Sequence, residues 1–438
     1  GSINDPGSSD AHIVFTSLKD ASKGGDTNED GSSTSPSGGD WGTLVVDSNN
    51  CTFTYCDFFY GGQGNYDDYA QLQINTGTQP LSHLTFARSK NAGLLLNTPG
   101  ITVTDCTFYL NDKPLIMEAE NTVDDSNLFH NPANINQKNT RNGIWITQNV
   151  EGNATWGATE VPFVLTDSMF VYSGTLTLSP GVMVKLHESY ININANGAIQ
   201  AAGTAVKPIT FTSLYDDEFG GDTPNSITLA TPGDWSYISI EGNGSTFAYC
   251  DFYYGGAGNY PDYAMVTFGT ASATIDSCIF AHSANAALNI VNASNATVVT
   301  NNAFFDNTCP LWMSGDFNIS ATNIFHNPAN PLEGNIQNGI WLDGAWVSTP
   351  RTWSVTEVPY ICPSMGIEDD ITLTIASGAI LKFEDDAYFQ INDGAALAGF
   401  AGVTFTSLKD DTRGGDSNGD GNATSAAWGD WQGVFNYN

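Results

Sequence analysis

Basic residues and long apolar runs are both scarce in this chain, and each absence narrows the possible functions. Only 13 of the 438 residues are lysine or arginine, against 47 aspartates and glutamates, so the formal net charge is −34. A negative field of that size repels phosphate backbones, so we expect no nucleic-acid partner. No apolar run approaches the roughly 18–20 residues that a membrane-spanning helix needs, so we expect no membrane insertion.

Cysteine is also sparse, and its pattern excludes two common kinds of scaffold. The chain has seven cysteines, an odd number, and no C-x-x-C pair. We therefore expect neither a disulfide framework nor a zinc site. No signal peptide is recognisable, but the acidic composition suits extracellular water. We expect a secreted or cell-surface localisation and a fragment of a longer exported protein.

A long internal repeat organises the sequence, and such repeats point to solenoid folds. FTSLKD at 15–20 returns as FTSLYD at 211–216 and FTSLKD at 405–410, so the offsets are 196 and 194. The motif GDW recurs at 39–41, 233–235 and 429–431, and YCDFFYGGQGNYDDYA at 55–70 returns as YCDFYYGGAGNYPDYA at 249–264. We predict one continuous structure over 1–438, comprising the end of a preceding module (1–14), copy one (15–210), copy two (211–404) and the start of copy three (405–438).

A shorter rhythm runs inside each copy and indicates the fold. Phe58, Phe86, Phe108 and Phe129 follow one another at spacings of 28, 22 and 21, and Phe252, Phe280, Phe304 and Phe325 repeat that rhythm as 28, 24 and 21. The segments around them are rich in Thr, Val, Ile and Phe and are separated by Asn and Gly, which is typical of short strands. A period of roughly 22 residues fits one turn of a parallel β-helix, with helical repeats as the rival. It implies roughly 16–20 turns with aromatic rings stacked from coil to coil, about 4.8 Å apart.

Small and polar residues recur two positions before several of these phenylalanines. Residues two apart on a strand share a face, so we expect the cysteines there to be buried as small hydrophobes and the asparagines to form a hydrogen-bonded ladder at a turn. The cysteines are Cys56, Cys106, Cys250 and Cys278, and the asparagines are Asn127, Asn302 and Asn323.

Several of these motifs together carry a family resemblance. GTLTLSPGVMVKL at 174–186, PITFTSL at 208–214, the acidic loop ending in GDW, the YGG loop and the TEVPYI stretch resemble a large group of secreted bacterial and archaeal right-handed parallel β-helix proteins, similar in fold to pectate lyases. The resemblance covers nearly the whole chain. It implies an all-β, single-stranded, right-handed parallel β-helix that serves as a module of a larger surface protein, and it implies no catalytic unit.

The acidic insertion between FTSL and GDW contains the most specific chemical motif. It spans residues 19–41 (loop one), 215–235 (loop two) and 409–431 (loop three). Loops one and three contain D-x-N-x-D-G, the first half of an EF-hand-type calcium loop, in which alternating oxygens converge on a hard cation. Loop two lacks that core, so we expect weak calcium binding there or none. The alternative for loops one and three is a turn with solvated aspartates.

The expected Ca²⁺ ligands combine the motif with acidic residues that flank it. No bidentate acid stands at the twelfth loop position, where Ser37 and Ala427 occur. Aspartates near the loop ends are therefore candidates for the missing ligand. The candidate ligands are Asp20, Asp26, Asn28, Asp30 and Asp40 in loop one, and Asp410, Asp416, Asn418, Asp420 and Asp430 in loop three.

A sugar site is the main alternative function. The Y-G-G-x-G-N-Y turns could present aromatic faces to a polysaccharide or cell-surface glycan, although glycines that form a tight turn covered by tyrosines explain the same residues. The candidate sugar-binding residues are Tyr60, Tyr66, Tyr69, Tyr254, Tyr260 and Tyr263. We expect the GDW tryptophans to pack against the acidic loops.

The residues needed for catalysis are largely missing. A polysaccharide lyase needs an arginine or lysine base beside calcium, but the chain has only four arginines, and Arg141 aligns with Gln337 in the other copy. No Ser/His/Asp constellation is visible, and His130 and His326 suit turn or packing roles. We expect no catalytic residue. The favoured function is a calcium-stabilised structural or adhesive segment, as a monomeric rod or part of a larger chain, with polysaccharide binding and then a calcium-dependent lyase as alternatives.

Overall fold

The computed structural model describes residues 3–66, 68–399 and 401–437. Those residues form β-strands, turns and bends and contain no helix, so none that could span a membrane. The parallel sheets stack as a β-solenoid of about 15 turns, which confirms the predicted all-β solenoid. The number of turns is below the expected value because the long loops use residues without adding a coil.

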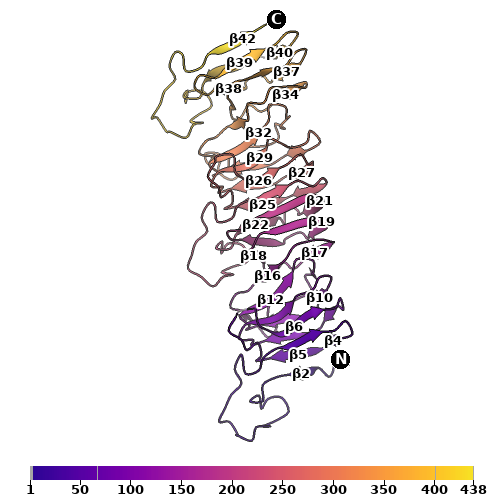
Figure 1. The fold of residues 1–438 in the computed structure, drawn as a ribbon. Helices are drawn as coiled ribbons and strands as arrows, with labels where there is room; N and C mark the ends of the chain where they lie inside the picture. The colour runs from indigo at the N-terminus through magenta and orange to yellow at the C-terminus, as the bar shows by residue number, and fades with distance from the viewer. Residues whose placement is uncertain (1–2, 67, 400, 438) are drawn as a thin grey trace. The chain divides into compact units, whose positions relative to one another are not determined.

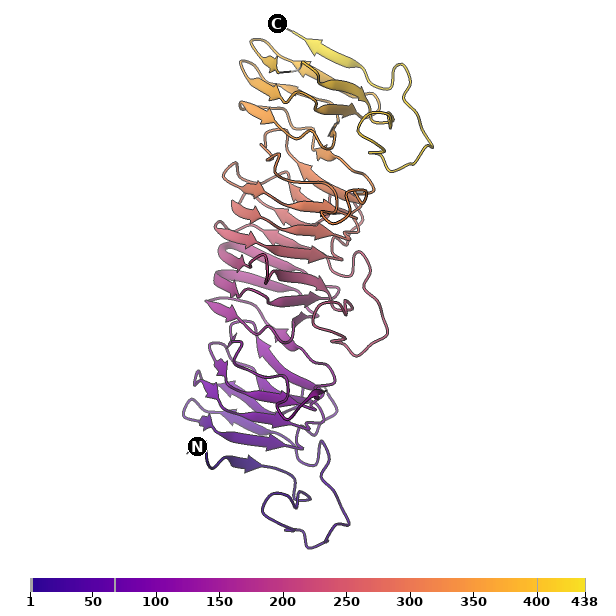
Figure 2. The same ribbon diagram turned by 180° about the vertical axis from the view of Figure 1, so that it is seen from behind.

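The chain divides into two compact units, which are described one at a time. Unit 1 comprises Gly1–Ser189 and Gly197–Ala230, and unit 2 comprises Tyr190–Asn196 and Thr231–Asn438. In each unit the strands lie one above another (Figure 1), and the view from behind shows the acidic loops as long excursions without strands (Figure 2). The continuity of the solenoid and the module boundaries stay predictions.

Turns of unit 1 such as β4–β5–β6 contribute one strand to each of three parallel sheets. The first sheet contains β1 (Asn4–Pro6), β4 (Thr52–Thr54), β7 (Leu81–Ser82), β10 (Thr102–Thr104), β13 (Thr122–Val123), β17 (Ala154–Trp156) and β19 (Met169–Leu178). The second contains β2 (Ile13–Phe15), β5 (Cys56–Phe59), β8 (Thr85–Ala87) and β11 (Thr107–Tyr109). The third contains β3 (Leu44–Asp47), β6 (Ala70–Thr76), β9 (Ala92–Leu96), β12 (Lys113–Glu118), β16 (Ile144–Thr147), β18 (Phe163–Leu165), β20 (Met183–Leu186) and β22 (Ile209–Ser213). An antiparallel hairpin, β14 (His130–Asn131) and β15 (Asn134–Lys138), lies outside these sheets.

Unit 2 repeats this arrangement, and β21 (Ile191–Ala202) contributes residues to both units. One parallel sheet contains the start of β21, β23 (Ile238–Ile240), β26 (Ala264–Phe268), β29 (Ala286–Ile290), β32 (Cys309–Met313), β33 (Ile340–Leu342), β35 (Tyr360–Cys362), β38 (Ile380–Phe383) and β41 (Thr404–Ser407). Two further ladders are β24 (Ser245–Ala248), β27 (Ala273–Asp276) and β30 (Val298–Thr300), and β34 (Arg351–Trp353), β37 (Thr372–Ile375) and β40 (Ala396–Ala398). The remaining two are β25 (Cys250–Tyr253), β28 (Ile279–Ala281) and β31 (Ala303–Phe305), and β36 (Met365–Ile367), β39 (Tyr388–Ile391) and β42 (Gly433–Asn436).

The phenylalanine columns form as predicted, and they fill the core of each unit. In unit 1, Phe58 and Phe86 are paired in register with ring centroids 5.1 Å apart, and Phe108 continues the column at 5.2 Å. In unit 2, the rings of Phe252 and Phe280 are 4.8 Å apart. All five side chains are fully buried. Phenylalanines one solenoid turn apart therefore stack at the distance between neighbouring strands, as the sequence period predicts.

The cysteines behave as buried small residues, as expected. All seven are free thiols, and six of them are buried. Burial raises the pKa of the Cys106 thiol to about 12, so this thiol stays protonated and unreactive at neutral pH. The structure confirms a packing role for these cysteines.

Two asparagine ladders stabilise the turns, and the sequence interpretation found part of one. Asn302 donates to Asn323 Oδ1 at 2.9 Å as predicted. Asn127 accepts from Cys106 N at 3.0 Å and donates to Val103 O at 2.9 Å and to Asp124 Oδ1 at 3.3 Å. The second ladder, which follows the phenylalanine columns, was missed. Its pairs are Asn111 with Asn139 and Asn307 with Asn335, each joined at 2.9 Å.

Candidate calcium loops and aromatic turns

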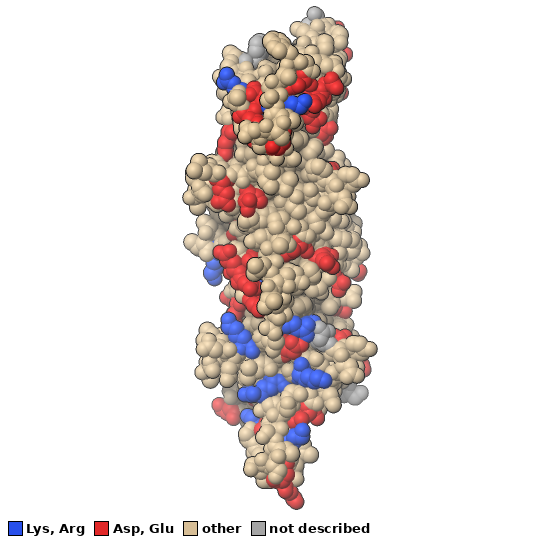
Figure 3. All heavy atoms as spheres, turned by 90° about the vertical axis from the view of Figure 1, so that its left-hand side faces the viewer, with Lys and Arg blue, Asp and Glu red and all other residues tan. Residues whose placement is uncertain are grey.

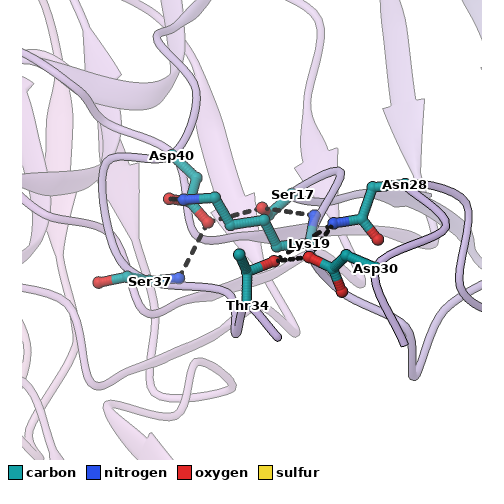
Figure 4. Close-up of polar contacts among 7 residues, drawn as sticks. All are labelled: Ser17, Lys19, Asn28, Asp30, Thr34, Ser37 and Asp40. Carbon is teal, nitrogen blue, oxygen red and sulfur yellow. Dashed lines mark hydrogen bonds and ion pairs between the residues drawn. The ribbon is translucent and has the colours of Figure 1, made fainter. Parts of the chain in front are cut away.

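The aspartates at the base of each acidic loop are held by groups of the protein itself. In loop one, Asp40 accepts hydrogen bonds from Ser17 Oγ at 2.6 Å and Ser37 N at 3.0 Å and pairs with Lys19 Nζ at 2.8 Å (Figure 4). Asp20 accepts from Thr16 Oγ1 at 2.7 Å and Ser22 Oγ at 2.6 Å. These two carboxylates fix the ends of the loop, and their predicted role as calcium ligands stays a prediction.

Loop three repeats this base. Asp410 accepts from Thr406 Oγ1 at 2.5 Å and Thr412 Oγ1 at 2.6 Å. Asp430 accepts from Ser407 Oγ and from the backbone amide of Ala427, both at 2.8 Å. The common pattern means that the FTSL strand and the GDW motif close each loop through hydroxyl–carboxylate hydrogen bonds.

The D-x-N-x-D-G core folds in the same way in loops one and three. Asp26 accepts from the backbone amide of Gly31 at 2.8 Å, and Asp30 accepts from Asn28 Nδ2 at 2.8 Å and from Thr34 Oγ1 at 2.5 Å (Figure 4). In loop three Asp416 and Asp420 accept the equivalent bonds from Gly421 N at 2.7 Å, Asn418 Nδ2 at 2.9 Å and Thr424 Oγ1 at 2.5 Å. The predicted core residues are thus brought together in both loops, on the tip side of the base aspartates.

Loop three adds a third carboxylate that the sequence interpretation did not include. Asp411, Asp416 and Asp420 each offer an oxygen, and these oxygens lie within 4.8 Å of one another. Asp411 Oδ1 is buried and has no hydrogen-bond partner within the described part of the chain. The same alignment gives Ala21 in loop one, so loop three has three converging carboxylates where loop one has two. The Asp-Asp pair at 410–411, shared with 216–217, was the available sequence signal.

Hydrogen bonds lower the pKa of three carboxylates in loop three and so favour their charged form. The hydrogen bond from Thr424 is the main reason that the pKa of Asp420 is lowered. At Asp430 the backbone hydrogen bond from Ala427, followed by that from Ser407, lowers the pKa. Burial alone would raise the pKa of Asp410, but hydrogen bonds from Thr406 and Thr412 outweigh it. Because all three pKa values are lowered, these carboxylates stay charged at mildly acidic pH.

Loop two has a base but no core of the D-x-N-x-D-G kind. Asp216 accepts from Thr212 Oγ1 at 2.5 Å, as its counterparts do. Asp222 accepts from Ser226 N at 2.9 Å in place of the glycine amide seen in the other loops. The absence of the motif therefore changes the path of the backbone around the aspartate that is shared by all three loops.

Two buried lysines beneath the loops were missed in the sequence. Lys185 on β20 donates from Nζ to Gly221 O at 2.7 Å and Thr223 Oγ1 at 2.9 Å in loop two. Lys382 on β38 donates to Gly415 O in loop three. Both lysine side chains are fully buried. On the loop side of unit 2, Figure 3 shows many acidic and few basic side chains, and Lys382 supplies a buried ammonium group beneath that surface.

The aromatic turns are packed around their glycines, which favours the structural interpretation of the tyrosines. A Cβ atom at Gly64 would lie 2.2 Å from Cγ of Tyr69, and one at Gly258 would lie 2.3 Å from Cδ2 of Tyr263. Tyr254 stacks on His282 with ring centroids 4.8 Å apart. The tyrosines that remain prominent are Tyr66, 71% exposed, and its counterpart Tyr260, 63% exposed, whereas Tyr60 lies with Arg88 over its ring at 5.8 Å.

Two of the three GDW tryptophans, Trp41 and Trp235, bond to the strand that precedes the following aromatic turn. Trp41 Nε1 donates to Phe59 O and Trp235 Nε1 donates to Tyr253 O, both at 2.8 Å. A Cβ atom at Gly61 would lie 2.6 Å from the Trp41 ring, and one at Gly255 would lie 2.5 Å from the Trp235 ring. Trp41 and Trp235 therefore lie on a glycine of the aromatic turn, not on the acidic loop as expected, and Trp431 stacks on Phe383 with ring centroids 4.3 Å apart.

Substituting Gly61 by alanine is expected to destabilise unit 1 by about 1–3 kcal/mol, because the new methyl group overlaps the Trp41 ring. The measurement is the urea midpoint of unfolding, followed by circular dichroism. Gly42→Ala is the matched control, since a Cβ atom there would meet nothing within 4 Å. Equal midpoints for the two variants would show that Trp41 has room to move.

The repeated histidines each contact a glutamate side chain through Nδ1. His130 Nδ1 lies 2.5 Å from Glu160 Oε1, and His326 Nδ1 lies 2.5 Å from Glu357 Oε1. The same glutamates accept backbone hydrogen bonds from Phe129 and Phe325. Each glutamate therefore links the histidine side chain to the backbone of the residue before it.

Comparisons with protein-family models, with curated proteins and with solved structures give no match. The resemblance to secreted parallel β-helix proteins thus stays an expectation beyond the solenoid fold itself. Function has to be argued from the loops.

Proposed function

We propose that this chain is a structural segment of a secreted or cell-surface protein whose acidic loops are ordered by calcium. The observation that carries the proposal is the convergence of Asp411, Asp416 and Asp420, with one buried carboxylate oxygen that has no partner among the described residues. Calcium binds six to eight oxygens at about 2.3–2.6 Å, drawn from carboxylates, carbonyls and amide oxygens. The three carboxylates and Asn418 offer oxygen ligands of that kind in loop three.

The physical benefit of the cation is to order a long loop. A loop that leaves a solenoid turn loses conformational entropy and buries little apolar surface. Close carboxylates also repel one another in the absence of a counter-ion. A cation that binds only the folded loop offsets both terms, and stability then rises with its concentration.

Removing calcium is expected to lower the thermal midpoint of the protein. At a free calcium concentration 100-fold above the dissociation constant, one site contributes about 2.7 kcal/mol. The measurement is thermal unfolding by circular dichroism in calcium and in EGTA, together with calorimetric titration of the apo protein. We expect loop three to bind more tightly than loop one, because loop one has Ala21 in place of Asp411.

Matched variants locate the tighter site. Asp411→Asn removes one carboxylate from loop three and is expected to weaken the tighter site at least tenfold, whereas Asp217→Asn changes the equivalent residue of loop two and leaves it unaltered. An unchanged melting midpoint in EGTA would refute the calcium proposal.

Polysaccharide binding is the second candidate, and it rests on the exposure of Tyr66 and Tyr260. Each of these rings lies at the edge of a glycine turn where it could stack on a sugar. The packing of Tyr69 and Tyr263 on their glycines favours the structural role. A glycan array distinguishes the two functions.

A further inference from the structure

Lys185 is a charged residue on the outward-facing side of β20, and it is nevertheless buried. Its backbone pairs with Val164 on β18 and Thr212 on β22, all within unit 1. Strand alternation turns it away from the face of Val184 and Leu186, which belong to the core. It would be exposed there, but its side chain is fully buried.

Loop two covers the lysine. A Cβ atom at Gly220 would lie 2.9 Å from Cδ of Pro162, so the loop lies against the turn that precedes β18. A Cβ atom at Gly143 would lie 2.9 Å from Cγ2 of Thr223, which places the loop over the start of β16 as well. Loop two thus covers the outer face of these strands. The amine of Lys185 lies between the strands and the loop and donates hydrogen bonds to the loop.

The groups that face this amine are acidic or neutral. Asp216, Asp217 and Asp222 of loop two act on it electrostatically, and its strand neighbours Val164 and Thr212 carry no charge. A buried ammonium is costly unless it is hydrogen-bonded and paired. Burial lowers the pKa of Lys185 to about 8 while the three carboxylates oppose the shift, so the amine remains largely protonated at neutral pH.

The three loops differ in the groups that can neutralise the negative charge of their carboxylates. Loop one has the D-x-N-x-D-G core, and its own lysines lie at the surface, with Lys19 paired to Asp40. Thr27, the counterpart of the buried Thr223, is exposed. Loop two lacks the core and has Lys185. Loop three has both the core and the buried Lys382.

We propose that the ammonium group of Lys185 takes the place of a metal ion in loop two, so that this loop is ordered without calcium. The proposal rests on the proposed function for the comparison with loops one and three, but the role of Lys185 itself does not depend on it. The fixed cation neutralises Asp216, Asp217 and Asp222 from within and holds Gly221 O and Thr223 Oγ1 in hydrogen bonds. Loop two can therefore lose the motif and keep its fold.

Hydrogen–deuterium exchange, read peptide by peptide on the full chain, tests the proposal. In the wild-type protein we expect EGTA to accelerate exchange in loops one and three and to leave residues 215–230 unchanged. Lys185→Met keeps the length of the side chain and removes the charge. In EGTA it is expected to accelerate exchange over 215–230 at least fivefold, and added calcium is expected to restore part of the protection, because the three carboxylates then lack a counter-ion.

Lys185→Gln separates charge from hydrogen bonding. Glutamine can still donate to Gly221 O, so if it protects loop two in EGTA as lysine does, the amine is only a hydrogen-bond tether and the proposal is wrong. The proposal also fails if EGTA accelerates exchange in loop two of the wild-type protein, or if Lys185→Met leaves its exchange unchanged. Loops one and three serve as internal controls for folding. If EGTA does not change the exchange rates of loops one and three, the calcium proposal fails. The result for loop two is then still valid, because it depends on Lys185 alone.

Discussion

Replacing Phe86 by alanine is expected to lower the free energy of unfolding of unit 1 by about 3–5 kcal/mol, the usual range for a buried phenylalanine. Phe86 is fully buried in the middle of a column, with Phe58 on one side at 5.1 Å and Phe108 on the other at 5.2 Å. The substitution removes apolar contact area and two ring contacts at once. The neighbouring rings are fixed by strand register and cannot collapse into the cavity.

The measurement is urea unfolding followed by far-ultraviolet circular dichroism. Phe86→Leu is the matched control, because it keeps most of the volume and removes the aromatic contacts, and a loss of about 1.5 kcal/mol is expected. Phe280→Ala at the equivalent place in unit 2 should repeat the result, since its neighbours lie at 4.8 and 5.0 Å. A loss below about 1 kcal/mol for both alanine variants, the average for any point substitution, would mean that the column does not carry the core.

The phenylalanine column could be predicted because it arises from a short pattern that repeats once per solenoid turn. Each strand needs one large inward residue, and each turn of the solenoid brings the next such residue to the same place. The phenylalanine spacing therefore equals the number of residues in one solenoid turn and predicts the fold. The buried cysteines followed for the same reason. The D-x-N-x-D-G core of loops one and three was also recognisable, because it is a short motif whose residues hydrogen-bond to one another.

Lys185, Lys382 and Asp411 were missed because their roles depend on contacts that the local pattern does not contain. In the stretch Val182-Met183-Val184-Lys185-Leu186, strand alternation assigns the lysine to the solvent side, and that assignment of face is correct. It is buried by Gly221 and Thr223, which lie 36 and 38 residues later in the chain. Asp411 likewise points toward Asp416 and Asp420 only because the backbone turns at the glycines between them.

The second asparagine ladder was missed for another reason. Asn111 and Asn307 each follow their column phenylalanine by three residues, in turns where asparagine is a common residue of no special meaning. Their function appears only when the coils are stacked. Asn111 Nδ2 donates to Phe86 O at 2.9 Å, and Asn307 Nδ2 donates to Phe280 O at 2.9 Å. The ladder therefore holds the carbonyl groups of the same strands whose side chains build the aromatic column.

Substituting Asn111 by leucine is accordingly expected to destabilise unit 1 by about 3 kcal/mol or more, although leucine has nearly the same volume. Asn111 Oδ1 accepts from Ser89 N at 2.9 Å, and its Nδ2 donates to Phe86 O and to Asn139 Oδ1, both at 2.9 Å. Ser89 N and Phe86 O each lose this side-chain partner in a buried turn, whereas Asn139 Oδ1 keeps the bond from the Asn111 backbone amide at 3.1 Å. An unsatisfied buried polar group costs about 1–3 kcal/mol.

The urea midpoint is again the measurement, with Asn97→Leu as the control. Asn97 is exposed and its side-chain hydrogen bond to Asn75 lies at the surface, so a change within about 0.5 kcal/mol is expected there. The double variant Asn111→Leu with Phe86→Leu tests the link between the two columns. Because Asn111 binds the carbonyl of Phe86 itself, the two losses should not add. Strict additivity, or an Asn111→Leu variant as stable as Asn97→Leu, would show that the turn is open to water and that the ladder contributes little to the fold.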